Sequence, residues 1–192
     1  MQDCSIAATD LACRRGDRVL FHGLSLELQA GEALQIAGAN GIGKSSLMRI
    51  LAGLMPPYAG SVACQGAVGL IDERPALDTH QPLGAALAFW QRIDGPAEDA
   101  TARLGLSHLL DVPVRYLSTG QKKRAAFARL IGQGAPIWLL DEALNGLDSD
   151  AARLAETLAA EHCAQGGICI VASHQAFALQ PMRRVELAEF AA

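Results

Sequence analysis

Alternating and clustered apolar residues at the start of the chain predict a β-rich segment. Residues 5–12 and 19–28 form two such runs, and the second contains the alternating string LSLEL. The glycine-containing turn at residues 15–17 lies between them, which is typical of a β-hairpin. A third run at residues 32–37 leads into a glycine-rich stretch. We therefore expect an antiparallel β subdomain near the N-terminus.

A helical period follows the glycine-rich stretch. Apolar residues between 47 and 54 recur at i, i+3, i+4 and i+7, which predicts an amphipathic helix that packs on the sheet. Two prolines at 56–57 are expected to end this helix. Short apolar runs at 62–63 and 67–71 then predict further strands.

The middle of the chain, residues 72–116, differs in character. Helical apolar periods span residues 83–93 and 97–110, and an Asp-Gly-Pro string at 94–96 joins them. We interpret this stretch as a small helical insert within one fold.

From residue 117 the pattern again alternates between helix and strand. It predicts helices at 122–132 and 150–163, and buried strands at 137–140 and 168–172.

These elements predict one α/β domain over residues 1–192, with helices flanking a mixed central sheet. We divide it into a β subdomain with the glycine-rich loop at 5–71, the insert at 72–116, and the remaining core at 117–192.

Composition agrees with a covered core and excludes several classes of protein. Hydrophobic residues make up 51% of the 192 residues, which suits a sheet covered on both faces. The net charge of −4 argues against a nucleic-acid-binding surface. No run approaches the roughly 18–20 apolar residues that span a bilayer. The first residues, MQDCSIAATD, do not resemble a secretory signal, so we expect a cytoplasmic protein.

The five cysteines have no C-x-x-C spacing and are expected to be buried, reduced thiols.

The string GANGIGKSS fits the phosphate-binding pattern G-x-x-x-x-G-K-[ST]. Its glycines allow backbone N–H groups to surround a phosphate, and a helix beginning near Lys44 adds its positive end. Lys44 would reach the β- and γ-phosphates, and the Ser45 hydroxyl would bind Mg²⁺. The predicted nucleotide-binding residues of this phosphate loop (residues 38–46) are Gly38, Ala39, Asn40, Gly41, Ile42, Gly43, Lys44, Ser45 and Ser46.

Two strand ends offer groups for hydrolysis. The strand IWLL leads to Asp141, which we expect to hold Mg²⁺ through water, and to Glu142, which we expect to orient or deprotonate the attacking water. Helix capping is the alternative for this acidic pair. His174 follows another strand and is expected to stabilise charge on the γ-phosphate, although a lone histidine is more often structural.

The string LSTGQ, which we call the signature segment (residues 117–121), precedes a basic helix. Ser118 is predicted to cap that helix, and the Gly120 backbone would help to offer the helix's positive end to an anion. The two roles are compatible.

These motifs and their order resemble the ABC-type ATPases, with their P-loop NTPase fold, from about residue 11 to residue 179. Within them, the chain is most similar to the ATP-binding subunits of cytochrome c maturation, or haem export, systems. Four strings carry this likeness: LACRRGDRVLFHGLSLELQAGE, SLMRILAGLMPPYAG, LSTGQKKRAAFARL and ASHQAF.

The resemblance implies a transport ATPase that uses ATP and Mg²⁺. It implies a homodimer in which the signature residues Leu117, Ser118, Thr119, Gly120 and Gln121 act on the ATP of the other subunit. It places Asp148 in a dimer loop and Arg15 where an aromatic residue usually stacks on adenine; a guanidinium can also stack on a purine. It further implies integral membrane partner subunits and a peripheral location on the cytoplasmic face of the inner or plasma membrane.

The chain departs from the family pattern at one position near the metal. Ungapped alignment places Arg74, with Glu73 beside it, where these ATPases usually carry a glutamine that senses Mg²⁺. An arginine there cannot coordinate a cation. The proline usual after the catalytic glutamate is Ala143, and Asn145-Gly146 replaces a more common Ser-Ala.

Three alternatives stay open. The chain could serve another ABC transporter, such as an importer or lipid exporter, or act as a weakly hydrolysing regulatory module. A DNA-repair or translation ABC protein is disfavoured, because such chains carry paired ATPase units, coiled-coil arms or basic extensions. We expect no nucleic-acid partner, and no residue is assigned to direct haem binding.

Overall fold

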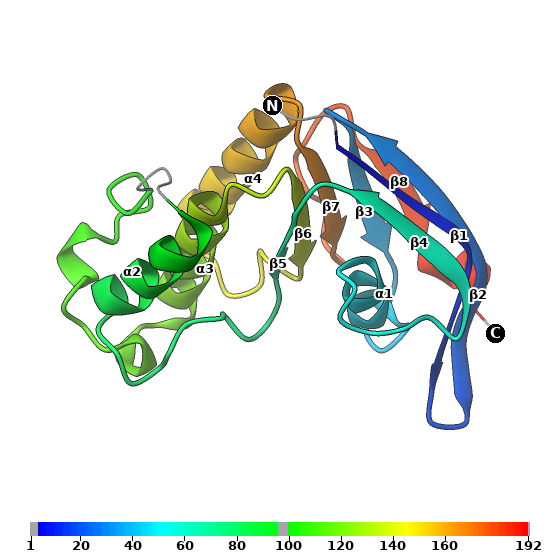
Figure 1. Ribbon diagram of the computed structural model, residues 1–192, viewed down its shortest axis with the longest axis horizontal. Helices are drawn as coiled ribbons and strands as arrows, with labels where there is room; N and C mark the ends of the chain where they lie inside the picture. Colours follow the sequence, from blue (N-terminus) through cyan, green and yellow to red (C-terminus); the bar gives the residue numbers. More distant parts are fainter. Residues whose placement is uncertain (1–3, 96–99, 192) are drawn as a thin grey trace.

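The computed structural model describes residues 4–95 and 100–191, which form two β-sheets with helices packed around them (Figure 1). The smaller sheet contains β1 (Ser5–Arg15), β2 (Arg18–Gln29) and β4 (Ala59–Gln65), in the order β2-β1-β4 and wholly antiparallel. The predicted hairpin is confirmed. It is longer than expected, because pairing continues to Arg15 opposite Arg18 and leaves only Gly16 and Asp17 in the turn.

The central sheet has the order β5-β6-β7-β3-β8, and every neighbouring pair is parallel. Its strands are β3 (Ala33–Ala37), β5 (Val68–Ile71), β6 (Ile137–Asp141), β7 (Ile168–Ala172) and β8 (Arg183–Glu186). The expectation of a mixed central sheet is therefore wrong: the antiparallel pairs belong to the smaller sheet. The sequence analysis also missed β8, because its RRVE string is partly exposed and has no apolar run.

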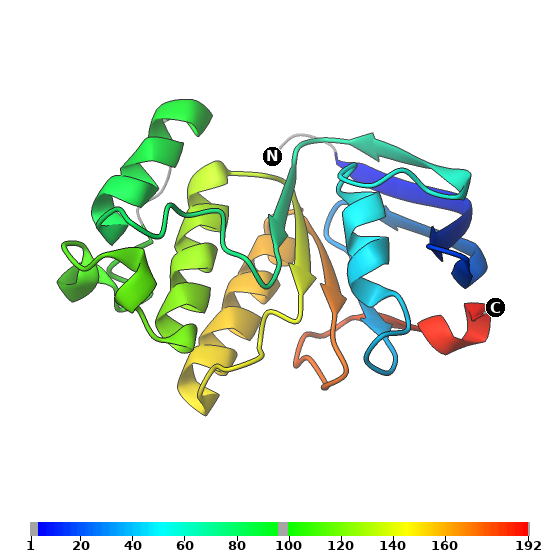
Figure 2. The ribbon, with the colours of Figure 1, turned by 90° about the horizontal axis from the view of Figure 1, so that it is seen from below.

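Four α-helices surround the sheets: α1 (Lys44–Leu51), α2 (Leu83–Asp94), α3 (Thr119–Gln133) and α4 (Ser149–Ala164). In Figure 2, α1 lies between the two sheets, α3 and α4 lie on the other side of the parallel sheet, and α2 lies beyond α3. Three short 3₁₀ segments complete the described fold: η1 (Ser107–Leu109), η2 (Val114–Tyr116) and η3 (Leu187–Phe190). No helix among the described residues is long and apolar enough to span a bilayer.

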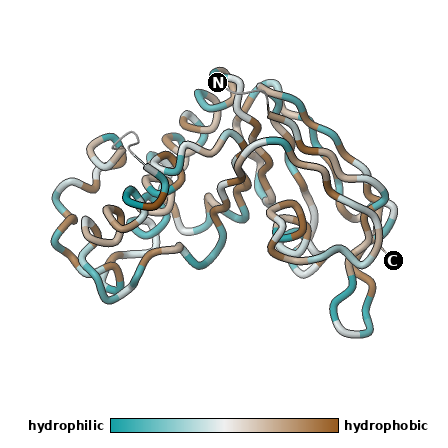
Figure 3. Tube along the Cα trace, viewed as in Figure 1, coloured by the Kyte–Doolittle hydropathy of each residue, from teal (hydrophilic) through white to brown (hydrophobic). Residues whose placement is uncertain are grey.

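The parallel sheet separates two hydrophobic cores. Successive residues of β6 face opposite sides, so Leu139 packs with α1 and the smaller sheet, whereas Trp138 and Leu140 pack with the helices of the other side. Figure 3 shows apolar residues concentrated along the central strands and hydrophilic residues at the tip of the β1–β2 hairpin. Burial on both faces explains the continuous apolar runs of β6 (IWLL) and β7 (ICIVA).

The helix α1 begins at Lys44 as predicted but ends earlier than the prolines suggested. It ends at Leu51, and Gly53 follows with a φ of 70°, which takes the chain out of the helix. Leu54 is consequently 69% exposed, although its spacing predicted burial on the apolar face.

One helix of the insert is confirmed and the other is wrong. The helix α2 matches the prediction for 83–93, whereas residues 100–110 form turns and the 3₁₀ segment η1; residues 97–99 lie outside the described ranges. Leu104 and Leu106 are buried, but Gly105 between them adopts a φ of 63°. The apolar residues therefore reach the core without a continuous helix.

The cysteines only partly follow expectation. None of the five cysteines, all of which lie in the described ranges, forms a disulfide; Cys4, Cys13 and Cys169 are buried, but Cys64 is exposed and Cys163 is half-buried.

Leu139→Ala tests the division of the core. Leu139 is fully buried, so removing its side chain should lower the free energy of unfolding by about 3 kcal/mol. The matched control Leu54→Ala should change it by less than about 0.5 kcal/mol. Urea denaturation measures both, and equal effects would contradict the assignment of these two side chains to core and surface.

Candidate active site

The phosphate loop connects the end of β3 to the start of α1. Gly43 precedes the helix with a φ of 120°, and a Cβ there would lie 3.2 Å from Phe21 and 3.3 Å from Leu20. Both the backbone conformation and the close packing of β2 therefore favour glycine. Because α1 begins without a side-chain cap, backbone N–H groups of its first turn remain available to an anion.

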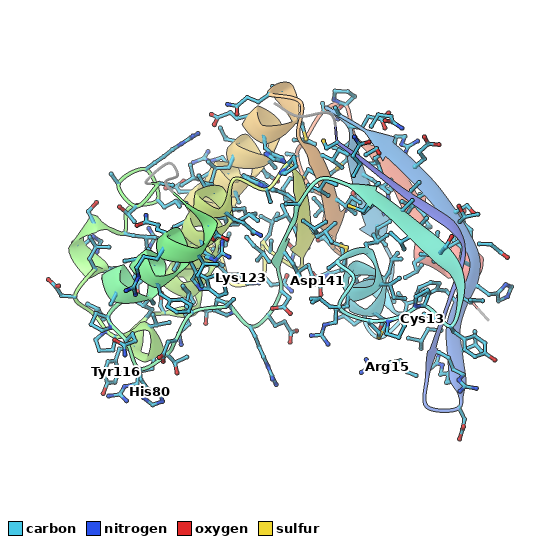
Figure 4. The ribbon with its side chains drawn as sticks, viewed as in Figure 1. Cys13, Arg15, His80, Tyr116, Lys123 and Asp141 are labelled. Carbon is cyan, nitrogen blue, oxygen red and sulfur yellow. The ribbon has the colours of Figure 1, made fainter. Side chains whose placement is uncertain are left out.

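An open cavity of about 560 Å³ lies over this loop, which is within the size range of nucleotide and other small-molecule sites. It is lined by Arg15, Leu20, Asn40, Gly41, Gly43, Lys44, Ser45, Ser46, Glu73, Glu142 and Asn145. The predicted residues Gly38, Ala39 and Ile42 belong to the same loop but are not among those lining residues. Figure 4 shows Arg15 beside the β1–β2 hairpin, where it adjoins the turn, and Asp141 at the end of β6.

Lys44 is the buried cation of the site. Its side chain is 5% exposed, and Nζ donates hydrogen bonds to the carbonyl oxygens of Gly38 (2.8 Å) and Ala39 (3.3 Å). The same Nζ lies 3.3 Å from Oε1 of Glu142. The structure thus brings together the predicted phosphate-binding lysine and the predicted catalytic glutamate.

Glu142 lies at the carboxyl end of β6 with a φ of 48°, a left-handed conformation that is uncommon for glutamate. Its N–H donates to the carbonyl oxygen of Ala172 at 2.9 Å, which ties it to the end of β7. Its Oε2 lies 3.1 Å from Nδ1 of His174. Glu142 is therefore flanked by Lys44 and His174, as expected for groups that act on one substrate.

Asp141 is nearly enclosed, with 3% exposure, and its Oδ1 has no hydrogen-bond partner among the described residues. Burial raises the pKa of this carboxyl above its usual value, while a hydrogen bond with the Ser45 side chain lowers it. The paired oxygens of Asp141 and Ser45 are hard donors of the kind that Mg²⁺ prefers. Among the described residues, no group of three or more His, Cys, Asp and Glu could hold a metal by itself. Mg²⁺ bound by one carboxylate, a hydroxyl, phosphates and water fits this arrangement.

The loop after β5 reaches the cavity with Glu73, whereas Arg74 is exposed and does not line it. The Arg74 N–H donates to Oδ1 of Asp72 at 2.9 Å, which fixes the local turn. A carboxylate, not a guanidinium, therefore faces the cavity at this point.

The signature segment lies at the start of α3. Ser118 is the N-cap: its Oγ accepts from the N–H of Gln121 at 3.2 Å, and its own N–H donates to Oε1 of Gln121 at 2.8 Å. Gly120 packs close to residues before α4, where a Cβ would lie 3.4 Å from the carbonyl oxygen of Gly146. None of residues 117–121 lines the cavity over the phosphate loop. The structure of one chain therefore does not bring the signature segment to the phosphate loop.

Asp148 caps the next helix. Its Oδ1 accepts from the N–H of Ala151 at 2.8 Å at the start of α4.

Sequence reasoning did not identify Lys123 as a residue of this region. Lys123 lies on α3 with 9% exposure, and Nζ donates to the carbonyl oxygen of Glu142 at 3.1 Å. Burial lowers the pKa of Lys123, and nearby carboxylates, Asp141 first, oppose that shift. A lysine on the apolar face of a predicted helix is the sequence signal that could have identified Lys123.

Comparisons with known proteins agree on one family of relatives. A family model described as ABC transporter matches residues 21–145. The cytochrome c biogenesis ATP-binding export protein CcmA of Novosphingobium aromaticivorans is 58% identical over 190 residues, covering 99% of each chain. The protein with the same description from Zymomonas mobilis subsp. mobilis is 47% identical over 190 residues, covering 97% of this chain and 86% of that one.

Two solved structures share the fold. One is an ATP-binding subunit of an ABC transporter, with a TM-score of 0.78 and 22% identity, covering 88% of this chain and 79% of that chain. The other is an inward-facing metal-chelate type ABC transporter, with a TM-score of 0.77 and 22% identity, covering 91% of this chain and 74% of that chain.

Lys44→Ala should weaken nucleotide binding, because it removes the cation that lies at the phosphate loop. A hydrogen bond to a charged group contributes about 1.5–3 kcal/mol, so the Kd for ATP should rise by about 10- to 100-fold. Equilibrium binding of a fluorescent ATP analogue measures this. Arg153→Ala, at an exposed position on α4, is the control and should bind normally. Unchanged affinity in Lys44→Ala would contradict the assignment of the cavity to phosphates.

Proposed function

The chain belongs to the ABC transporter family, in its cytochrome c biogenesis ATP-binding export branch, and we propose that it hydrolyses ATP to power haem export or an equivalent step of cytochrome c maturation. The observation that carries the proposal is the position of Glu142, which lines the cavity over the phosphate loop together with Lys44 and contacts both Lys44 and His174. Phosphoryl transfer to water requires a cation for the phosphates and a base for the attacking water. Lys44 supplies the cation, Glu142 supplies the base, and His174 lies next to Glu142.

The cavity residues suggest how ATP is held. The phosphates lie in the loop at residues 38–46, with Lys44 on the β- and γ-phosphates. Arg15 stacks on the adenine ring from the hairpin side of the cavity. Ser45 and Asp141 would hold Mg²⁺, the latter through water, and the ion would supply positive charge that offsets the charge of the phosphates.

Glu142 serves as the base. Lys44 pairs with Glu142 at 3.3 Å, and the more highly charged phosphates of ATP compete for the same ammonium. When Lys44 turns to the phosphates, the Glu142 carboxylate is free to accept a proton from water. The water oxygen bonds to the γ-phosphorus, the bond from that phosphorus to the β–γ bridging oxygen breaks, and ADP leaves with that electron pair. His174 stabilises charge on the γ-phosphoryl oxygens.

A homodimer completes each site. In the proposed dimer, residues 117–121 of one subunit contact the γ-phosphate held by the loop of the other, through Ser118 and the positive start of α3. Asp148 lies in the loop that faces the partner. ATP binding closes the dimer, and hydrolysis reopens it.

The insert offers a surface for membrane subunits. A groove of about 590 Å³, which we call the insert groove, is lined by Pro75, Ala76, Leu77, Asp78, Gln81, Ala85, Ala86, Phe89, Trp90 and Arg92. Phe89 is 50% exposed there, and Trp90 donates its indole N–H to the carbonyl oxygen of Ala76, which fixes one wall. A segment of the membrane subunit that presents apolar residues fits this groove, which holds the protein at the cytoplasmic face of the membrane.

Glu142→Gln tests the base and the cellular role together. It should retain ATP binding, trap a dimer and lower hydrolysis by about 100-fold or more, because the amide cannot accept the proton of water. Cells that carry only this variant should lose haem-stained c-type cytochromes, whereas Glu161→Gln, on the surface of α4, should support normal levels. Normal turnover in Glu142→Gln would exclude it as the base. Normal cytochromes with a stable, inactive variant would instead favour another ABC transporter.

Phe89→Asp tests the insert groove. A carboxylate at the wall of an apolar groove should abolish copurification with the membrane subunits, because the charge loses its hydration there. ATP binding should be unchanged. The matched control is Ile93→Asp, one turn further along α2, which is 60% exposed and outside the groove. Equal losses in both variants would contradict docking at the groove.

A further inference from the structure

We infer that Lys123 is a positioning residue for ATP hydrolysis, which holds the main chain of Glu142 so that its carboxylate faces the cavity. This inference rests on the proposed role of Glu142 as the base. The contact joins Lys123 of α3 to the carbonyl oxygen of Glu142 and lies outside the phosphate loop and the signature segment. The helix α3 is on the face of the parallel sheet opposite to α1.

The backbone of Glu142 requires support from its surroundings. A φ of 48° is unfavourable for a residue with a side chain, and such conformations persist where several contacts fix them. Three hydrogen bonds hold the main chain of Glu142. Its N–H donates to the carbonyl oxygen of Ala172 at 2.9 Å, and its carbonyl oxygen accepts from Lys123 Nζ at 3.1 Å and from the N–H of Asn145 at 3.2 Å. Loss of the Lys123 contact leaves that carbonyl oxygen with the turn bond from Asn145 alone, so the peptide after Glu142 is held less firmly and the direction of the side chain is less well fixed.

Packing alone does not account for a lysine at this position. Lys123 shares the buried face of α3 with Ala126, Phe127 and Leu130, so an apolar side chain would fill the space. Burying an ammonium group instead has a large desolvation cost unless partners compensate for it. The partner that compensates for this cost is Glu142, the proposed base, whose position determines the rate of hydrolysis.

The charges around Lys123 also come from the active site. Asp141, Asp72, Glu73 and Glu142 all favour its charged form. Figure 4 shows Lys123 on α3 beside Asp141 at the end of β6. Lys44 contacts the Glu142 side chain from the phosphate loop, whereas Lys123 contacts its main chain from α3. Two different cations thus contact Glu142 from two sides, and only the Lys123 contact is independent of the exchange of Lys44 to the phosphates.

The helix α3 carries both the signature segment, at its start, and Lys123, which contacts Glu142. The helix α3 begins at the signature segment, which acts on the ATP of the partner subunit in the proposed dimer. A shift of α3 on dimer closure therefore reaches the Glu142 main chain of the same subunit through Lys123. When the signature segment contacts the ATP of the partner subunit, the position of Glu142, which acts on the ATP of its own subunit, changes with it.

Steady-state ATP hydrolysis of Lys123→Met, Lys123→Arg and the control Lys122→Met tests the inference. Misplacing a catalytic group by about 1 Å lowers rates by about 100-fold, so kcat of Lys123→Met should fall by at least about 10-fold. KM and the Kd for ATP should stay within about twofold, because the phosphate loop is intact. Lys123→Arg, which keeps the charge and donors, should recover most of kcat. Lys122, whose Nζ instead donates to the carbonyl oxygen of Arg115, should be replaceable without effect.

Two further measurements separate the possible failures. Lys123→Gln, which retains a donor but no charge, replaces Lys123→Met if the latter does not bind ATP or melts early. Wild-type kcat in a folded Lys123→Met or Lys123→Gln protein, or an equal loss in Lys123→Arg, overturns the inference. Glu142→Gln is measured in parallel: if it hydrolyses ATP normally, the proposed base is wrong, whereas if it is inactive and Lys123→Met is not, only the role of Lys123 fails.

Discussion

The parallel pairing of β3, β6 and β7 is the constraint on which the active site depends. Their register aligns Ile36 with Ala172, and Ala172 with Asp141, so the three strands end at one edge of the sheet. The phosphate loop, the pair Asp141-Glu142 and His174 follow these strand ends directly. Because parallel strands all point the same way, groups from residues 38 to 174 meet at one edge of the sheet.

That pairing is held by burial on both faces of the sheet. One face packs on α1 and the smaller sheet, and the other packs on α3 and α4. One helix on each face then brings a charged group to the shared edge: Lys44 starts α1, and Lys123 lies on the inner face of α3. Packing of the hydrophobic cores thus determines where Lys44 and Lys123 lie. These buried charges position the active-site residues and add little to the stability of the fold.

Cations and carboxylates lie close together around the site. Lys44 pairs with Glu142, and Asp72, Glu73, Asp141 and Glu142 all favour the charged form of Lys123. In the proposed function, a bound nucleotide competes with Glu142 for Lys44, so binding exchanges one ionic partner for another. A site organised in this way responds to its ligand by exchanging partners, which suits an ATPase that must couple binding to movement.

The sequence by itself determined the parts that depend on local backbone chemistry. The phosphate loop requires glycines at fixed spacing, buried parallel strands require apolar runs, and the N-cap of α3 requires Ser118 with Gln121, so each could be predicted from its own residues. Tertiary structure alone decided that β8 joins the sheet and that all five of its strands are parallel. It also decided that Glu73 faces the cavity and Lys123 reaches Glu142. These features depend on residues far apart in the chain, where packing and not local preference selects the partner.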